Sequence, residues 1–441
     1  MKKSIQAPPS KSVSHRALIS AALARGNSLI RSPLQSDDLD RTRECLSRLG
    51  AAFRGSGSAP VITGVGSAKS IAGDPVTLPV GESGTTCRLL AAVASAFSGH
   101  FLVSGTGRMH DRPIQDLTEA LSPLGPDFEF LEKPGFPPFL IHSNGLSGGT
   151  TRVSLQESSQ FLSGILLAAP LAAGEITVEV GGSKVVSWPY VGITLQVMQE
   201  FGMEIQIEIL SDGSWKRTGY TQMKEVRPGE VRFRILPGFY SAREYQVEGD
   251  WSNASYFLAA SALLQSPVPV SGLRRDSLQG DRALLDILSR MGATISWDDG
   301  SVLVRGGNLK GIDVDMGHCP DIVPTVAVLA SMISGVTRIR NVAHLRIKES
   351  DRLMAVSEQL EQAGCRTKLY DDGIDIFPHS QKPGRIVEFK TYGDHRIAMS
   401  MSLFELAGLD VRLDNPGCVA KSFPAFWDKW KPIRERYAAS R

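Results

Sequence analysis

Paired cysteines and long apolar runs are both missing from this sequence, and each absence narrows the class of protein. The five cysteines are scattered, and no two of them form a C-x-x-C pair, which fits a reducing cytoplasm better than an oxidising compartment. No apolar run is long enough to span a bilayer, and the first residues show neither an apolar h-region nor an Arg/Ser-rich presequence. We therefore expect a cytoplasmic protein with no membrane partner.

A strong charge of either sign is missing as well. The formal net charge is only +2, which argues against nucleic-acid binding, because that binding needs a basic surface to displace counterions. No spacing of His, Cys and carboxylates resembles a metal site, and the G-x-x-x-x-G-K-[ST] pattern of nucleotide-hydrolysing proteins does not occur. We expect no nucleic-acid partner, no metal and no cofactor.

What the sequence does contain is a weak internal repeat. Six times a polar or glycine-containing turn is followed by an Ala/Leu-rich helical segment, a β-like run, a charged turn and a second helix, the last copy being cut short after Lys421. The starts lie roughly 70–90 residues apart, a period suited to βαβαββ units. The first helices are expected to begin near Ser12, Gly84, Ser159, Ser252, Asp321 and Asp394.

These repeats predict an α/β fold in two domains of three units each. The chain has 441 residues, 42% of them hydrophobic, and about 150 residues per domain allows two or three domains. An irregular, charged and aromatic stretch from Ser211 to Glu248 separates the third unit from the fourth. We expect one domain over residues 11–240 and a second formed by residues 1–10 with residues 241–441.

Unusual polar residues gather at the expected helix starts, where unpaired N–H groups and the helix dipole favour anions. Asp321 is expected at an N-cap, Pro113 in a first helical turn, and Lys421 at the start of the last segment. Any single Ser, Thr or Asp there is commonly just a cap, and a lone Arg or Lys is usually solvated surface. Because nearly every unit repeats the arrangement, we expect a cleft between the domains that binds a multiply anionic substrate.

Eight ordered motifs then identify a family resemblance over essentially the whole chain. PSKSVSHRAL, ESGTTCRLL, RMHDRPI, SSQFLSG, PDIVPTVAVLA, RIKESDRL, GDHRIAMS and AKSFPAFW closely resemble the EPSP synthase family, the 3-phosphoshikimate 1-carboxyvinyltransferases of aromatic amino-acid biosynthesis. The resemblance implies a two-domain enolpyruvyl transferase fold, an inside-out α/β barrel of three βαβαββ units per domain, with the active site in the interdomain cleft. It also implies transfer of the carboxyvinyl group of phosphoenolpyruvate to the 5-hydroxyl of shikimate 3-phosphate, and a monomer is expected.

The resemblance carries site residues with it. The residues implied for shikimate 3-phosphate are Lys11, Ser12, Arg16, Ser158, Ser159, Gln160, Ser187, Tyr190, Asp321, His344 and Lys348. Those implied for phosphoenolpyruvate are Lys11, Gly84, Arg112, Gln160, Arg352, Arg396 and Lys421. The reaction needs an acid for carbon C3 and a base for the 5-hydroxyl, and the resemblance implies Glu349 near C3 and Asp321 near the hydroxyl, with Lys11 assisting.

Two positions depart from the family pattern. Glu82 stands where the family commonly has Asn, and it either weakens anion binding or pairs with a neighbouring Arg; His344 stands where some members have Asn. Gly84 is retained, which leaves room for inhibitors such as glyphosate that mimic phosphoenolpyruvate.

Three alternative functions remain open at this point. One is the sister enzyme that acts on UDP-N-acetylglucosamine, although its reactive cysteine is missing from the loop Gly107–Arg112. A non-catalytic phosphate-ligand binding protein would not need Asp321 and Glu349. An RNA-end-processing enzyme would be expected to have a more basic surface with exposed aromatics.

Overall fold

The chain folds into two compact units. The computed structural model describes residues 4–55, 57–66, 71, 73–223, 226–264 and 268–439. The N-terminal unit comprises Ser10–Val247, and the C-terminal unit comprises the described residues up to Pro9 and from Glu248 onward. The division lies after Val247 rather than after residue 240, because strand β14 (Glu244–Gln246) pairs in parallel with β2 (Asn27–Arg31) of the N-terminal unit.

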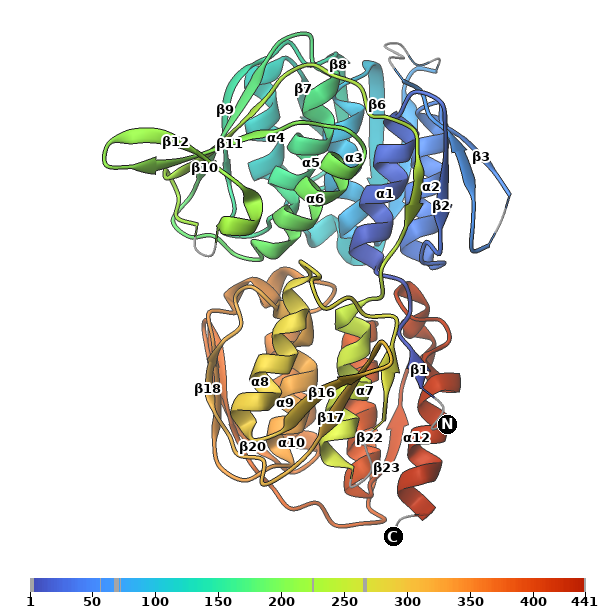
Figure 1. Ribbon diagram of the computed structural model, residues 1–441, viewed down its shortest axis with the longest axis vertical. Coiled ribbons are helices and arrows are strands. Elements are labelled where there is room, and N and C mark those ends of the chain that lie inside the picture. The colour runs from blue at the N-terminus through green and yellow to red at the C-terminus, as the bar shows by residue number, and fades with distance from the viewer. Residues whose placement is uncertain are drawn as a thin grey trace. The chain divides into compact units, whose positions relative to one another are not determined.

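The N-terminal unit contains three sheets packed around its helices (Figure 1). Counted along each repeat, the strands lie in the order first, second, last, third in all three sheets, with one added strand at the edge of the third sheet. In each sheet the first two strands are parallel, the last strand of the repeat pairs antiparallel with the second, and the third pairs antiparallel with the last, which is the expected βαβαββ pattern. The first repeat contains β14, α1 (Lys11–Leu23), β2, α2 (Asp37–Arg48), β3 (Ala52–Arg54) and β4 (Val61–Thr63). The second contains β5 (Val76–Gly81), α3 (Gly84–Ala94), β6 (Ser98–Gly105), η1 (Gly107–Asp111), α4 (Gln115–Leu121), η2 (Ser122–Leu124), β7 (Asp127–Phe130) and β8 (Phe139–Asn144).

The third repeat has an additional hairpin strand, and the stretch expected to be irregular supplies it. The repeat contains β9 (Gly149–Ser154), α5 (Gln160–Ala168), η3 (Ala169–Leu171), β10 (Ile176–Gly181), α6 (Pro189–Glu200), β11 (Gln206–Ser211), β12 (Ser214–Thr218), η4 (Tyr220–Gln222) and β13 (Val231–Ile235). The expectation that residues 211–248 are irregular is therefore wrong for β12, β13 and β14. Their ladder bonds organise this segment, and β13 (VRFRI) alternates buried apolar residues with charged ones as a strand with one buried face does.

The C-terminal unit repeats the pattern twice and then shortens it. The fourth repeat contains β1 (Ile5–Gln6), α7 (Trp251–Leu263), β15 (Val270–Ser271), η5 (Gly280–Ala283), α8 (Leu284–Met291), β16 (Thr294–Asp298) and β17 (Ser301–Arg305). The fifth contains β18 (Asp313–Asp315), η6 (Pro320–Ile322), α9 (Val323–Ser331), β19 (Thr337–Arg340), η7 (Ala343–Ile347), α10 (Arg352–Gln362), β20 (Arg366–Tyr370) and β21 (Gly373–Phe377). The sixth contains β22 (Ile386–Phe389), α11 (His395–Met401), η8 (Ser402–Ala407), β23 (Asp410–Leu413), η9 (Pro416–Lys421) and α12 (Phe426–Ala439).

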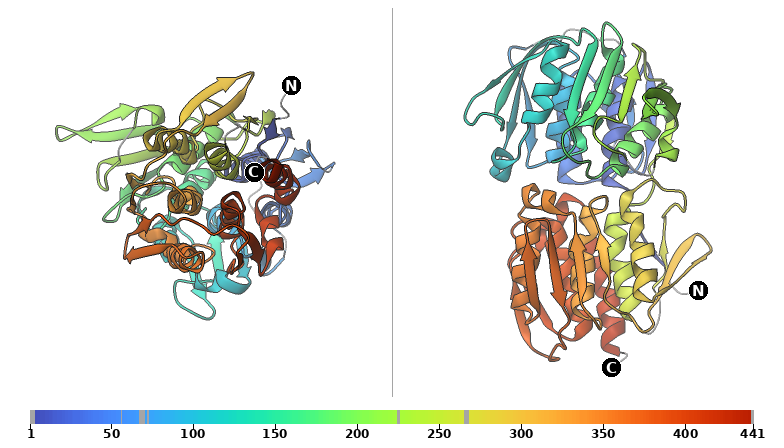
Figure 2. Two further views of the ribbon diagram at one scale, coloured as in Figure 1. Left: turned by 90° about the horizontal axis from the view of Figure 1, so that it is seen from below. Right: turned by 90° about the vertical axis from the view of Figure 1, so that its left-hand side faces the viewer.

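The first helix of each repeat lies inside its unit, and the sheets cover the helices from outside (Figure 2). Helix α1 is buried from Val13 to Leu23, and every residue of α9 and α11 is buried. Such helices are apolar on all sides, which is the pattern of a helix enclosed by protein. The second helices, such as α2, carry charged residues on their outer side. The predicted α/β class is confirmed.

Three of the expected helix boundaries are wrong. Asp321 is not an N-cap; it lies within η6, and its carboxylate faces arginine side chains instead of backbone N–H groups. Pro113 precedes Ile114, the N-cap of α4, so it lies outside the first turn. Lys421 ends η9 instead of beginning a helix, because α12 starts only at Phe426.

In the part of the chain that the structure describes, no helix combines the length and the apolar character that crossing a bilayer requires.

The pairing of strand β1 with β15 should contribute to the stability of the C-terminal unit. The Ile5 N–H donates to the Pro269 carbonyl at 2.8 Å, on the inner side of an edge strand. Ile5→Pro should remove this bond and destabilise the C-terminal unit by about 1–3 kcal/mol, although most of that unit lies more than 240 residues later in the chain. Hydrogen exchange should show faster opening of β15 in Ile5→Pro and unchanged opening in Ile5→Val. Equal protection of β15 in both variants would contradict the prediction.

Candidate active site

Helix α1 of the N-terminal unit begins with a lysine that has a carboxylate partner. Lys11 Nζ lies 3.1 Å from Asp38 Oδ2, and Ser10 caps the helix by accepting from the Val13 N–H at 3.4 Å. A cation at a helix start is unfavourable, because the dipole is already positive there. Asp38 compensates for it, and an anionic ligand could take over that role.

One turn further along α1, Arg16 is buried among neutral partners. It donates to the hydroxyls of Thr194 (2.7 Å) and Ser163 (3.2 Å) and to the carbonyls of Ser12 (2.9 Å) and Tyr190 (3.1 Å). Burial lowers the pKa of Arg16 to about 10, so the guanidinium stays charged at neutral pH. A positive charge in such a setting attracts an anion more strongly than a solvated one does.

The start of α5 is organised around a second buried arginine. Arg88 Nη1 donates to Gln160 Oε1 at 3.1 Å and to Ser158 Oγ at 3.4 Å, and the Gln160 side chain donates in turn to Thr85 Oγ1 at 2.9 Å. Ser158 Oγ also accepts from the Gln160 N–H. Three of the implied ligands, Ser158, Ser159 and Gln160, therefore open α5 as expected, and α3 and α5 pack side by side.

Gly84 and Arg112 lie against each other at the start of α3. A Cβ on Gly84 would overlap the Arg112 guanidinium, so the absence of a side chain allows this approach. Arg112 Nη1 donates to the Glu82 carbonyl at 3.5 Å. The Glu82 side chain lies against Gly107, whose φ of 54° is in the left-handed region. The departure at Glu82 thus places a carboxylate beside the turn that holds Arg112.

Ser187 lies just before Trp188, the N-cap of α6, and α6 carries Tyr190. The φ of Ser187, 54°, is unusual for a residue with a side chain. Its hydroxyl is buried and has no hydrogen-bond partner among the residues that the structure describes. Strained, unsatisfied positions of this kind cluster at ligand sites, which agrees with the role implied for Ser187.

Arg352 organises the C-terminal unit. Its side chain is 1% exposed, and its donors reach three carboxylates: Asp394 at 2.8 Å, Asp321 at 2.9 Å and Glu349 at 2.6 Å. Ser350 Oγ also donates to Asp394, at 3.0 Å. Burial alone lowers the pKa of Arg352, but Asp394, Glu349 and Asp321 outweigh burial and raise it. Asp321 and Glu349 were both expected at the site, and one buried cation brings them together.

Asp321 is shared between two guanidiniums. Its second oxygen accepts from Arg396 Nη2 at 2.7 Å. Burial raises the pKa of Asp321, but Arg396, Arg352 and Lys348 outweigh burial and hold the pKa well below its ordinary value. Asp321 is therefore ionised at neutral pH and is a weak base while both arginines bind it.

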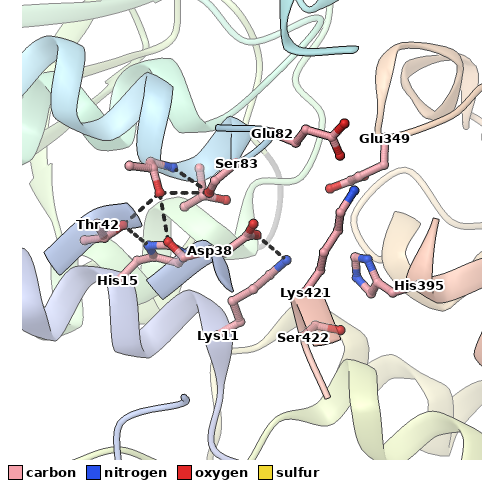
Figure 3. Close-up of polar contacts among 12 residues, drawn as sticks. Lys11, His15, Asp38, Thr42, Glu82, Ser83, Glu349, His395, Lys421 and Ser422 are labelled. Atoms are coloured by element: carbon pink, nitrogen blue, oxygen red, sulfur yellow. Dashed lines mark hydrogen bonds and ion pairs between the residues drawn. The ribbon is translucent and has the colours of Figure 1, made fainter. Parts of the chain in front are cut away.

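The remaining implied residues of this unit lie on neighbouring segments. Lys421 Nζ donates to the Gly393 carbonyl at 3.3 Å, one residue before the N-cap of α11. Figure 3 shows the side chains of Lys421 and Glu349 pointing toward one another. His344 is buried in η7. Together these residues offer carboxylates for proton transfer beside fixed positive charges.

Four residues that take part in these contacts had no role predicted from the sequence: Asp38, Thr85, Arg88 and Asp394. Arg88 and Asp394 stand at helix starts, but nothing in their spacing distinguishes a residue that binds a ligand from one that holds other side chains in place. An arginine at the head of the buried run CRLLAAVASA is the one available signal, because such a charge must find partners inside the protein.

The described residues contain no group of three or more His, Cys, Asp or Glu side chains suited to a metal ion.

The buried carboxyl group of Asp281 is close enough to Asp321 to feel its charge, and it should make the stability of the protein depend on pH. Asp281 is 2% exposed, its Oδ2 bonds the Ser252 hydroxyl, and η5, which carries it, packs against η6. Burial, with the charge of Asp321, raises the pKa of Asp281 from 3.8 to about 7. The protonated Asp281 side chain contributes fully to the stability of the protein below the pKa that Asp281 has in the unfolded state. This contribution is lost as the pH rises through the pKa of Asp281 in the folded state.

The Asp281→Asn variant should therefore gain stability relative to the wild type as the pH rises from about 4 to about 7, by at least ~1 kcal/mol at pH 8. Chemical unfolding of both proteins at pH 5 and pH 8 measures the difference. A difference that does not change with pH would contradict the prediction.

The chain is similar to proteins of one family over nearly its whole length. The sequence pattern of the family described as EPSP synthase (3-phosphoshikimate 1-carboxyvinyltransferase) matches residues 1–430. The 3-phosphoshikimate 1-carboxyvinyltransferase of Vibrio atlanticus is 39% identical over 431 residues, covering 97% of this chain and 96% of the relative. The enzyme of the same name from Aeromonas salmonicida is 39% identical over 432 residues, covering 98% and 96%.

A solved structure supports the fold independently. The EPSP synthase from Acinetobacter baumannii superposes with a TM-score of 0.74 at 25% identity, covering 98% of this chain and 96% of the other. The enolpyruvyl transferase fold that the motifs imply is thereby confirmed. The chain belongs to the EPSP synthase family.

Proposed function

We propose that this chain transfers the carboxyvinyl group of phosphoenolpyruvate to the 5-hydroxyl of shikimate 3-phosphate, giving 5-enolpyruvylshikimate 3-phosphate and phosphate. The observation that carries the proposal is the buried Arg352, which brings Asp321 and Glu349 together beside Arg396. A protein that only bound phosphate ligands would have no need for two carboxylates held in this way.

Anion binding is assigned to the basic side chains and to the polar start of α5. In the N-terminal unit, Arg16 and the start of α5 serve shikimate 3-phosphate, and Arg112 beside Gly84 serves phosphoenolpyruvate. Arg352, Arg396 and Lys421 of the C-terminal unit serve phosphoenolpyruvate as well. Arginine suits both groups, because its planar fork matches phosphate and carboxylate oxygens.

Proton transfer is assigned to the carboxylates. As the 5-hydroxyl oxygen adds to C2 of phosphoenolpyruvate, Asp321 accepts the hydroxyl proton, and C3 gains a proton beside Glu349 to give a tetrahedral phosphate ketal. A bound anion competes with Asp321 for the guanidinium of Arg396, so binding of the anion raises the pKa of Asp321 and makes it a better base. Lys11 carries charge near both steps, and phosphate leaves as C3 loses a proton.

The finer assignments belong to this proposal too. The chain acts in the cytoplasm, since its five cysteines are free and buried, which suits a reducing compartment. It acts as a monomer, which light scattering coupled to gel filtration can check.

Release of inorganic phosphate tests the reaction directly. Release should require phosphoenolpyruvate and shikimate 3-phosphate together, and UDP-N-acetylglucosamine should not replace the second substrate. Phosphate release with UDP-N-acetylglucosamine alone would favour the sister activity, and none with either acceptor would leave a binding protein.

Removal of either carboxylate should slow turnover. Asp321→Asn and Glu349→Gln should each lower kcat by about 10²–10⁴-fold, because each removes a proton-transfer group. Asp313→Asn is a suitable control, since Asp313 is 71% exposed and pairs with Arg338 in the same unit. A folded Asp321→Asn or Glu349→Gln protein with the control's kcat would refute the role of that residue.

A methyl group at position 84 should act selectively on phosphoenolpyruvate. In Gly84→Ala the new Cβ displaces the Arg112 guanidinium, so KM for phosphoenolpyruvate should rise about tenfold, a loss of ~1.4 kcal/mol of binding. KM for shikimate 3-phosphate should stay within about threefold. Gly219→Ala provides a control, because its nearest neighbouring atom lies 3.8 Å from the added Cβ. An unchanged KM for phosphoenolpyruvate in Gly84→Ala would contradict the role of Arg112.

A further inference from the structure

A buried chain of hydrogen bonds crosses the first three helices of the N-terminal unit. His15 Nδ1 on α1 lies 2.8 Å from Thr42 Oγ1 on α2, which lies 2.8 Å from Thr86 Oγ1 on α3. All three side chains are fully buried, and Figure 3 shows His15, Thr42 and Ser83 joined in one run of contacts. The proposed mechanism does not use these hydrogen bonds, and none of the residues assigned to substrate binding takes part in them.

The chain ends at two features of the candidate site. Thr86 Oγ1 donates to the Ser83 hydroxyl at 2.8 Å and to the Asp38 carbonyl at 3.2 Å. Ser83 is the N-cap of α3, immediately before Gly84, and its hydroxyl accepts from the Thr86 N–H at 3.2 Å. The Asp38 side chain holds Lys11. One set of buried hydrogen bonds therefore reaches both the turn at Ser83 and Gly84, which we call the Gly84 turn, and Asp38, the partner of Lys11.

The acceptors around Thr86 favour one direction for these bonds. Thr86 has a single hydroxyl proton, which faces Ser83 and the Asp38 carbonyl, and when that proton is used there Thr42 donates its own proton to Thr86. Thr42 then offers only lone pairs to His15, so His15 donates from Nδ1–H. This arrangement corresponds to the neutral tautomer with its proton on Nδ1.

The rest of the His15 environment supports this tautomer. Its Nε2 is buried and has no hydrogen-bond partner among the described residues, so a proton there would be an unsatisfied donor. Burial, with the charges of Lys11 and Arg16, lowers the pKa of His15 well below its ordinary value. A neutral donor at a fixed nitrogen is what the chain requires.

We propose that His15 is a positioning residue for the carboxyvinyl transfer. Through Thr42 and Thr86 it fixes the Ser83 cap and the backbone of Asp38, so that the Gly84 turn and Lys11 are in place before a substrate binds. The inference rests on the proposed function, because it assigns a role at the same site. Preorganisation of this kind lowers the ordering that binding must supply.

Four variants test the role by steady-state kinetics. His15→Leu and Thr42→Val should raise KM for phosphoenolpyruvate about tenfold with kcat changed less than about threefold, as expected for a broken buried hydrogen bond. His15→Asn should stay within about threefold of the wild type, because its amide N–H can take the place of Nδ1–H. Thr118→Val is the matched control: Thr118 is a buried helical threonine of the same unit, and its hydroxyl donates at 2.9 Å to the Gln115 carbonyl.

Nitrogen NMR of the wild type without substrate adds a readout that folding alone does not move. His15 should show a protonated Nδ1 and an unprotonated Nε2, and the hydrogen-bond shift of Nδ1–H should disappear in Thr42→Val. Should His15→Leu fail to fold, Thr42→Val and His15→Asn still decide the outcome.

The inference is overturned if Thr42→Val matches Thr118→Val in KM for phosphoenolpyruvate, or if the proton of His15 lies on Nε2. These results differ from failure of the proposed function, in which the wild type itself would release no phosphate from the two substrates.

Discussion

A guanidinium buried in the C-terminal unit must be neutralised where it lies, and the site of that unit is built on this constraint. Arg352 is surrounded by Asp394, Asp321 and Glu349, and leaving such a charge without partners would cost several kcal/mol. The residues assigned to proton transfer are therefore also the counter-ions of a buried charge. Their orientation is set before any substrate arrives.

The N-terminal unit solves the same problem differently. Arg16 and Arg88 are as deeply buried, but the hydrogen-bond acceptors described above for them are hydroxyls, carbonyls and an amide oxygen. The neutral partners of Arg16 satisfy its donors without cancelling its charge, so this unit keeps an attraction for anions. Positive charge for anion binding is thus assigned to both units, and the carboxylates for proton transfer are assigned to the C-terminal unit alone.

Much of this was accessible from the sequence, and the limits have physical causes. The six-fold repeat predicted the α/β class and the starts of α1, α3 and α5, because an enclosed helix is apolar on all sides and bears its polar residues at its ends. Asp321 was wrongly placed at a cap, because a short helix beginning at Pro320 looks the same in sequence whether its aspartate faces backbone or an arginine. The pairing of Arg88 with Gln160, and the chain from His15 to Thr86, depend on side chains about 70 residues apart, which no local pattern reports.

The separation of strand β1 from the rest of the C-terminal unit along the chain has a consequence for folding. Strand β1 belongs to the C-terminal unit although it is synthesised first, and β14 closes the first sheet of the N-terminal unit. In topological terms the N-terminal unit is an inserted domain, entered after Pro9 and left after Val247. Pro9 and Gly249 form an antiparallel bridge, so the entry and exit points are neighbours. The inserted domain can fold while the chain is still being synthesised. Strand β1 of the host domain, in contrast, can pair only after its partner strand β15 has been synthesised.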